Sequence, residues 1–304
     1  MPTPTFLVVG TARAGTTAVV EGLRTHPDVF VTQPKEPHYF AFHGTVPDFQ
    51  GPGDDEWINR IAITDRDRYL ALYDDAGYAL ARGDGSVSTL YYSAHAAPEI
   101  ARVNPEMKLV VVLREPVARA FSNYTYLRLR GVETEADFRG GLDREPERIA
   151  AHWHHMWHYT GLSHYADDLQ RLIDTVGRER VGVWFHDQLD RDYDTVLSEV
   201  AAFLELPGFP ERATMPRVNA SGTARLELAQ RAIRWATAHQ GVRAAVKTVV
   251  PFRVRERIRS GVIRSEEVPP EVREQLAPLF ADDLRGVAGL LSGELPDWLA
   301  PYAG

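Results

Sequence analysis

Three short runs of apolar residues stand out along the chain, and each gives way to a turn signal or to polar sequence. The runs cover residues 5–9, 108–113 and 181–185. Short valine-rich runs of this kind predict strands that are buried on both faces, as in a parallel sheet. The segments around them space their apolar residues as helices do. The predicted helices cover residues 16–25, 117–128, 165–176 and 194–204.

The alternation of strands with helices predicts an α/β fold. Because strand–helix–strand connections between parallel strands are right-handed, we expect a P-loop-like central parallel sheet flanked by helices. The sequence has no internal repeat and no long low-complexity linker, so residues 1–304 are expected to form a single domain. Residues 41–80 and 129–163 are less regular than the rest, and we expect them to form a lid or an acceptor pocket.

Composition narrows the class of protein. The hydrophobic fraction of 44% is that of a soluble globular protein, and the net charge of −8 argues against nucleic acid as a partner. The chain has no cysteine, which excludes disulfides and thiolate chemistry. No apolar run is long enough for a transmembrane segment, and the N-terminus lacks the basic start of a signal peptide, so a cytoplasmic location is expected. With only three lysines, arginine carries most of the positive charge.

The first predicted strand leads into a glycine-containing loop, Gly10–Thr17. Its two glycines have the spacing of a phosphate-binding P-loop, in which backbone N–H groups and the start of the next helix converge on an anion. A plain strand-to-helix turn is the alternative, but the position between a hydrophobic strand and two threonines favours the phosphate site. The candidate binding residues are Arg13, Ala14, Gly15, Thr16 and Thr17.

The loop lacks the lysine that follows the second glycine in ATP- and GTP-binding loops, because Thr16 occupies that position. The cation comes earlier, at Arg13. No convincing acidic Mg²⁺ ligand ends a later predicted strand, since Leu113 is followed directly by Arg114. A nucleotide kinase or NTPase is therefore disfavoured. Arg114 instead ends a buried run, where a cation needs an anion.

These motifs resemble those of sulfotransferases that use PAPS (3′-phosphoadenosine 5′-phosphosulfate), whose 5′-phosphosulfate loop follows the first strand in the same way. The family's second signature is an arginine at a strand end with a serine eight residues later, and Arg114 and Ser122 fit it. The resemblance implies that this pair holds the donor's 3′-phosphate. Arg13 stands where the family usually has lysine; a guanidinium can bind phosphate through two hydrogen bonds but cannot act as a proton donor.

Other segments are similar to the heparan-sulfate branch of that family. Residues 35–40, Lys-Glu-Pro-His-Tyr-Phe, match a segment whose glutamate is the proposed base. This implies that Glu36 is the catalytic base, with His38 as a rival base or an orienting group, and that Arg13 stabilises charge on the leaving oxygen. Gly85 stands where heparan-type enzymes usually carry a lysine, which argues against a glycosaminoglycan acceptor. A segment similar to the loop that closes over the nucleotide adds Asn219, Gly222 and Arg225 as candidate donor-binding residues.

The resemblance implies an enzyme that moves the sulfuryl group from PAPS to a hydroxyl of a sugar, a lipid or a secondary metabolite. The partner is then a small-molecule or carbohydrate acceptor, PAPS is the donor substrate, and no metal is required. A non-catalytic nucleotide-binding module is the alternative that keeps Arg114 and Ser122 but tolerates loss of Glu36. The acceptor's identity, O- or N-sulfation and the oligomeric state stay open.

Two segments carry chemistry that the resemblance does not assign. Residues 152–158 are rich in histidine and aromatic residues, and His154 and His158 have a spacing found among metal ligands. No accompanying base motif supports a metal, so we expect a helix that packs near the acceptor pocket, with plain core packing as the alternative. Residues 242–264 are basic. We expect a solvated helix face there, ahead of a contact with nucleotide phosphates or with a membrane surface.

Overall fold

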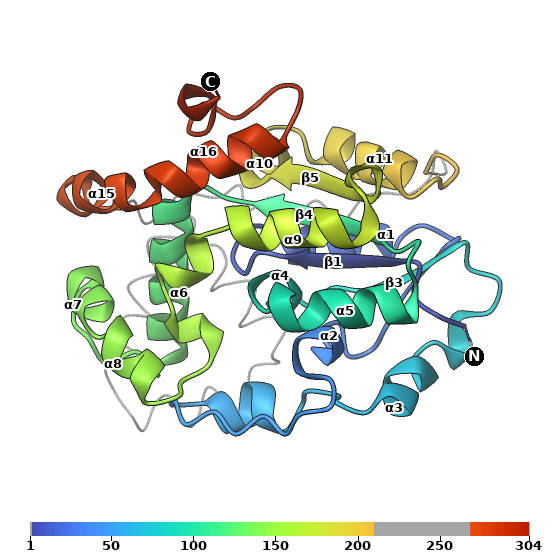
Figure 1. Cartoon of the computed structure of the whole chain (residues 1–304), viewed down its shortest axis with the longest axis horizontal. Helices are drawn as coiled ribbons and strands as arrows, with labels where there is room; N and C mark the ends of the chain where they lie inside the picture. The colour runs from blue at the N-terminus through green and yellow to red at the C-terminus, as the bar shows by residue number, and fades with distance from the viewer. Residues whose placement is uncertain (1, 210–267, 304) are drawn as a thin grey trace, which may run out of the picture.

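The computed structural model describes residues 2–209 and 268–303. Within them, a five-stranded parallel sheet forms the centre of the molecule, in the order β2-β3-β1-β4-β5 (Figure 1). The strands are β1 (Phe6–Gly10), β2 (Val29–Val31), β3 (Ala81–Asp84), β4 (Lys108–Leu113) and β5 (Val181–Phe185). The predicted α/β fold with a central parallel sheet is confirmed. The three predicted strands are present, and β2 and β3 are additional.

Helices surround this sheet. The α-helices are α1 (Thr16–Leu23), α2 (Tyr39–Phe42), α3 (Arg66–Ala71), α4 (Ser88–Tyr91), α5 (Ser93–Val103), α6 (Pro116–Arg130), α7 (Phe138–Asp143), α8 (Glu145–Ala150), α9 (Ala166–Val176), α10 (His186–Arg191), α11 (Tyr193–Phe203), α15 (Pro270–Leu276) and α16 (Ala281–Leu290). The short helical turns are η1 (Asp55–Asn59), η2 (Asp74–Ala76), η3 (His155–Trp157), η4 (Gly161–Ser163), η5 (Arg178–Arg180), η6 (Ala277–Phe280) and η7 (Ala300–Tyr302). The four predicted helices correspond to α1, α6, α9 and α11. Across the described parts of the chain, no helix has both the length and the apolar character needed to cross a membrane.

Each face of the sheet has its own hydrophobic core. Leu7 and Val9 of β1 belong to the core that includes α5 and α9, which lie over the sheet in Figure 1. Phe6 and Val8 belong to the second core, which includes α1 and α11. Because both faces are covered, the buried positions of the central strands are apolar on both faces rather than on one.

The carboxyl ends of β1 and β4 meet at one edge of the sheet, where ligands bind in folds of this type. The N–H of Thr11, just after β1, donates to the C=O of Val112 in β4 at 2.7 Å. After β4, the Glu115 carboxylate accepts hydrogen bonds from the first backbone N–H groups of α6 and so caps that helix. The glycine loop and Arg114 therefore lie side by side.

Candidate active site

The glycine loop between β1 and α1 has a backbone suited to an anion. Arg13 (φ 72°) and Gly15 (φ 102°) both adopt left-handed backbone conformations. Such turns within a loop direct successive N–H groups toward one concave side, and the positive end of α1 adds to the attraction. Thr16 is buried and Thr17 is exposed at the start of the helix. The geometry fits a phosphate group at the N-terminus of α1.

Arg114 and Ser122 lie against the same loop. Nη1 of Arg114 donates to the C=O of Arg13 at 3.0 Å, and Nε of Arg13 is 3.5 Å from Oγ of the buried Ser122. Burial, followed by the neighbouring Arg13 guanidinium, lowers the pKa of Arg114. The carboxylates of Asp190 and Asp187 have the opposite effect on this pKa but do not outweigh burial. Two adjacent guanidinium groups in this setting fit a bound phosphate.

Glu36 lies beside the loop as an ionised carboxylate. Its Oε1 accepts a hydrogen bond from Lys35 Nζ at 2.5 Å, and the same Nζ is 3.4 Å from Oγ1 of Thr17. Burial alone would raise the pKa of Glu36, but the positive charge of Lys35, together with hydrogen bonds from Lys35 and from the Val87 backbone, outweighs it. The pKa therefore lies below its usual range. The side chain of Lys35 thus lies between the Glu36 carboxylate and Thr17 in the first turn of α1.

His38 is held in one orientation next to Glu36. Its backbone is left-handed (φ 57°), its N–H donates to Ser86 Oγ at 3.0 Å, and its Nδ1 is 2.8 Å from Ser88 Oγ. Its Nε2 is 4.0 Å from Glu36 Oε2. Burial lowers the pKa of His38, so the ring is neutral at neutral pH. The arrangement suits a residue that orients Glu36.

Asn219, Gly222 and Arg225 lie outside the described residues, and so does the basic segment 242–264. Their predicted contacts with the donor stay predictions. The residues that the structure does bring together are Arg13, Arg114, Ser122 and the loop on one side, and Glu36 and His38 on the other.

The two segments predicted to form a lid or an acceptor pocket lie against each other. The N–H of Gln50 donates to the C=O of His152 at 3.0 Å. The carboxylate of the buried Asp54 accepts hydrogen bonds from the N–H of His154 at 2.9 Å and from Nε1 of Trp157 at 3.0 Å. Hydrogen bonds thus join the segments 41–80 and 129–163 to each other. Their role in binding the acceptor stays a prediction.

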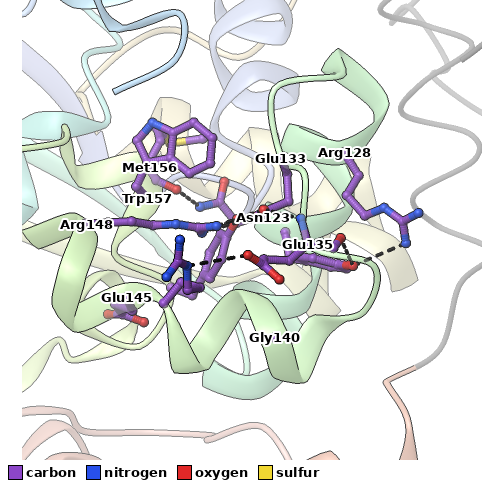
Figure 2. A network of polar contacts seen from close by, with 12 residues as sticks. Asn123, Arg128, Glu133, Glu135, Gly140, Glu145, Arg148, Met156 and Trp157 are labelled. Carbon is purple, nitrogen blue, oxygen red and sulfur yellow. Dashed lines mark hydrogen bonds and ion pairs between the residues drawn. The ribbon is translucent and has the colours of Figure 1, made fainter. Parts of the chain in front are cut away.

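Figure 2 shows the polar network that fixes the second segment to α6. Arg148 donates to both oxygens of Glu133, at 2.7 and 2.8 Å, and the hydroxyl of Tyr159 donates to Glu133 at 2.5 Å. From α6, Nδ2 of Asn123 donates to the C=O of Met156 at 2.6 Å. Because Asn123 follows Ser122 in α6, this hydrogen bond links the segment 129–163 to the part of α6 that carries Ser122.

The prediction of a helix over residues 152–158 is wrong, because the chain forms only the short 3-10 turn η3 there. His152 has a left-handed backbone (φ 59°), and Nδ1 of His154 accepts the N–H of Met156, which caps the turn instead of extending it. Burial lowers the pKa of His154 to about 3 and also lowers that of His155, so both rings are neutral. No cluster of three metal-ligating side chains occurs in the chain as described.

Sequence reasoning missed the residues that hold His38 in place. Asp84, at the end of β3, accepts hydrogen bonds from the Ser86 N–H at 2.9 Å and the Tyr69 hydroxyl at 2.7 Å. Ser86 in turn accepts the N–H of His38. The polar residues Asp84 and Ser86 at the end of a strand could have indicated a site, but β3 is too short and too polar to be recognised as a strand from the sequence.

Fold and site together define an α/β protein whose glycine loop has the geometry of an anion site, with a carboxylate next to it. The chain belongs to the sulfotransferase family: residues 3–216 match the model of the sulfotransferase domain. It is similar over nearly its whole length to a sulfotransferase from Alicyclobacillus acidocaldarius, with a TM-score of 0.74 and 30% identity over 98% of this chain and 99% of that one. The family consists of enzymes that transfer sulfuryl groups.

Curated relatives include animal sulfotransferases. Heparan sulfate glucosamine 3-O-sulfotransferase 6 of Homo sapiens is 29% identical over 204 residues, which cover 59% of this chain and 53% of that protein. Carbohydrate sulfotransferase 15 of Mus musculus is 28% identical over 159 residues, 40% of this chain and 27% of that protein. The chain spans about half or less of the length of these relatives.

Proposed function

We propose that this sulfotransferase takes its sulfuryl group from PAPS and transfers it to an acceptor hydroxyl. The observation that carries the proposal is the convergence of Arg13, Arg114 and Ser122 beside the glycine loop. A nucleotide with phosphates on both its 5′ and 3′ positions needs two neighbouring anion sites. The loop suits the 5′-phosphosulfate, and Arg114 with Ser122 suits the 3′-phosphate.

Glu36 is the proposed base. It accepts the acceptor's proton while the acceptor oxygen bonds to sulfur; the bond between sulfur and the 5′-phosphate oxygen breaks, and its electron pair leaves with adenosine 3′,5′-bisphosphate. Positioning and electrostatics dominate related phosphoryl transfers, and a general base typically adds about 10²–10⁴-fold. The ionised state of Glu36 and its closeness to Thr17 through Lys35 support this role.

A P-loop kinase or NTPase is the competing function. Thr16 stands where such enzymes need a lysine, which disfavours that function. Thermal-shift measurements separate the two, because a ligand that binds the folded state raises its melting temperature. Stabilisation by adenosine 3′,5′-bisphosphate without Mg²⁺, and none by ATP with Mg²⁺, is expected. The reverse pattern would remove PAPS as the donor.

The proposed acceptor is a small molecule or a carbohydrate that binds along the segments 41–80 and 129–163. These segments present partly exposed aromatic rings, among them Trp57, over which the guanidinium of Arg130 lies at 4.1 Å. Sugars and apolar small molecules both bind such rings. A screen of hydroxyl compounds with labelled PAPS, read as the mass gain of the product, identifies the acceptor.

A further inference from the structure

Lys35 is one of three lysines in the chain, and its ammonium group lies between the glycine loop and the proposed base. Nζ is 2.5 Å from Oε1 of Glu36 and 3.4 Å from Oγ1 of Thr17. The Lys35 side chain is only 15% exposed. Charges sheltered from water in this way interact more strongly than exposed ones.

The lack of a side chain at Gly85 leaves the space that Lys35 occupies. The N–H of Gly85 donates to the C=O of Lys35 at 2.9 Å. A Cβ atom at position 85 would lie 3.2 Å from Cε of Lys35 and 2.7 Å from Cγ2 of Val20, closer than packed carbon atoms normally approach. The methylene stem of Lys35 therefore crosses the place where a side chain at position 85 would begin.

Two side-chain contacts of Arg13, the cation of the glycine loop, are with α6. Nε of Arg13 is 3.5 Å from Ser122 Oγ, and the guanidinium is 4.5 Å from the centre of the Tyr126 ring. These contacts associate Arg13 with the side of the site that suits the 3′-phosphate. The ammonium of Lys35 contacts both Glu36 and Thr17 in the first turn of α1.

We propose that Lys35 is a catalytic cation that shifts from Glu36 to the leaving phosphate during sulfuryl transfer, which rests on the function proposed above. Before the reaction, its ammonium neutralises the Glu36 carboxylate. As the acceptor oxygen bonds to sulfur, the acceptor's proton moves to Glu36, which becomes neutral. The bond between sulfur and the phosphate oxygen breaks, and that oxygen keeps the electron pair. Negative charge thus disappears on one side of Lys35 and arises on the other.

The lysine side chain suits this transfer of charge. Its ammonium is a compact charge on a flexible stem and can follow the negative charge over a short distance, whereas a planar guanidinium has fixed bonding directions. An interaction that is stronger in the transition state than in the ground state accelerates the chemical step. Lys35 meets this condition because its ground-state partner, Glu36, is neutralised as the phosphate gains charge.

The test compares Lys35→Met with a matched control, Lys108→Met. Both substitutions remove a lysine paired with a carboxylate, but Nζ of Lys108 contacts Glu205, at 2.9 Å, outside the site. Turnover at saturating PAPS and acceptor is expected to fall by about 10²-fold or more in Lys35→Met, the size of effect seen for a lost transition-state contact. It is expected to stay at the wild-type level in Lys108→Met. Calorimetric affinity for adenosine 3′,5′-bisphosphate should be unchanged in both.

A second readout needs no donor. In the free protein, a carbon-13 NMR titration should find the Glu36 carboxyl titrating at higher pH in Lys35→Met than in the wild type. Gly85→Ala is a further probe, because its Cβ crowds the stem of Lys35 and leaves the ammonium in the chain. It should lower turnover while product affinity stays unchanged.

Three results overturn the role of Lys35. They are wild-type turnover in Lys35→Met, an unchanged titration of Glu36, or a parallel loss of turnover, product affinity and melting temperature, which would mark a structural residue. If Lys35→Met does not fold, wild-type turnover in Gly85→Ala overturns the role instead. If the wild-type protein neither binds adenosine 3′,5′-bisphosphate nor uses PAPS, the proposed function itself is wrong. If the wild type is active and one of the three results above is found, only the role of Lys35 is wrong.

Discussion

The buried ion pair between Glu133 and Arg148 offers a direct test of what holds the predicted acceptor segment in place. The two side chains are 0% and 5% exposed, and two hydrogen bonds join them. The substitution Glu133→Gln removes the negative charge with little change in shape. Arg148 then keeps its charge in a setting lined by Trp153, Trp157 and Tyr159.

The magnitude follows from this burial. Removing one partner of a buried pair costs about 3–5 kcal/mol, because the remaining charge stays desolvated and unpaired. Removing both charges in Glu133→Gln/Arg148→Met should cost less than the sum of the single changes, with a coupling of about 1–3 kcal/mol. In the double variant, the rings of Trp153, Trp157 and Tyr159 keep part of their packing against the methionine that replaces Arg148.

Urea denaturation of the wild type, both single variants and the double variant measures this coupling. Burial would raise the pKa of Glu133, but the hydrogen bonds from Arg148 and Tyr159 outweigh it and lower that pKa in the folded state. The stabilisation is therefore present above the carboxyl pKa of the unfolded chain and is lost as the pH falls through the folded-state value. Additive single effects, or a Glu133→Gln variant as acid-sensitive as the wild type, would refute this reasoning.

Three further substitutions test the site. Glu36→Gln should lower turnover by about 10²–10⁴-fold and leave binding of adenosine 3′,5′-bisphosphate intact, and near-normal turnover in this variant removes Glu36 as the base. Wild-type turnover should decline only toward acid pH, since the lowered pKa keeps Glu36 ionised at neutral pH. Arg114→Met should weaken the affinity for the same nucleotide by about 10–100-fold, because a hydrogen bond to a charged group contributes about 1.5–3 kcal/mol. An unchanged calorimetric affinity contradicts the proposal that Arg114 binds the 3′-phosphate. Gly15→Ala should destabilise the protein by about 1–3 kcal/mol, because the backbone is left-handed and the new Cβ would lie 2.8 Å from Cδ1 of Leu189; a melting temperature equal to that of the wild type contradicts this.

Much of the fold could be predicted because its central strands are buried on both faces. In β4, Leu109 to Leu113 are all fully buried, so the run is apolar at every position. The strands β2 and β3 could not be recognised in this way. Both are short, and β3 includes Arg82, Gly83 and Asp84, which pack or hydrogen bond through partners distant in sequence.

The parts of the site that follow a strand were also predictable, since the fold fixes where strand ends lie. The glycine loop and Arg114 are of this kind. The position of Lys35 was not, because it depends on the missing side chain at Gly85, more than forty residues away. The turn at residues 152–158 was mispredicted because its shape depends on the left-handed backbone of His152 and a side-chain cap, and a helical spacing of histidines does not reveal either.

The most direct test of the central claim is transfer of a labelled sulfuryl group from PAPS. The purified chain is incubated with PAPS carrying labelled sulfur and a panel of hydroxyl compounds, and products are read by mass spectrometry, with Glu36→Gln in parallel. The account predicts an acceptor that gains the labelled group, equimolar release of adenosine 3′,5′-bisphosphate, and both products formed about 10²–10⁴-fold more slowly by the variant. Consumption of ATP with Mg²⁺ but not of PAPS, or full activity of the variant, would contradict it.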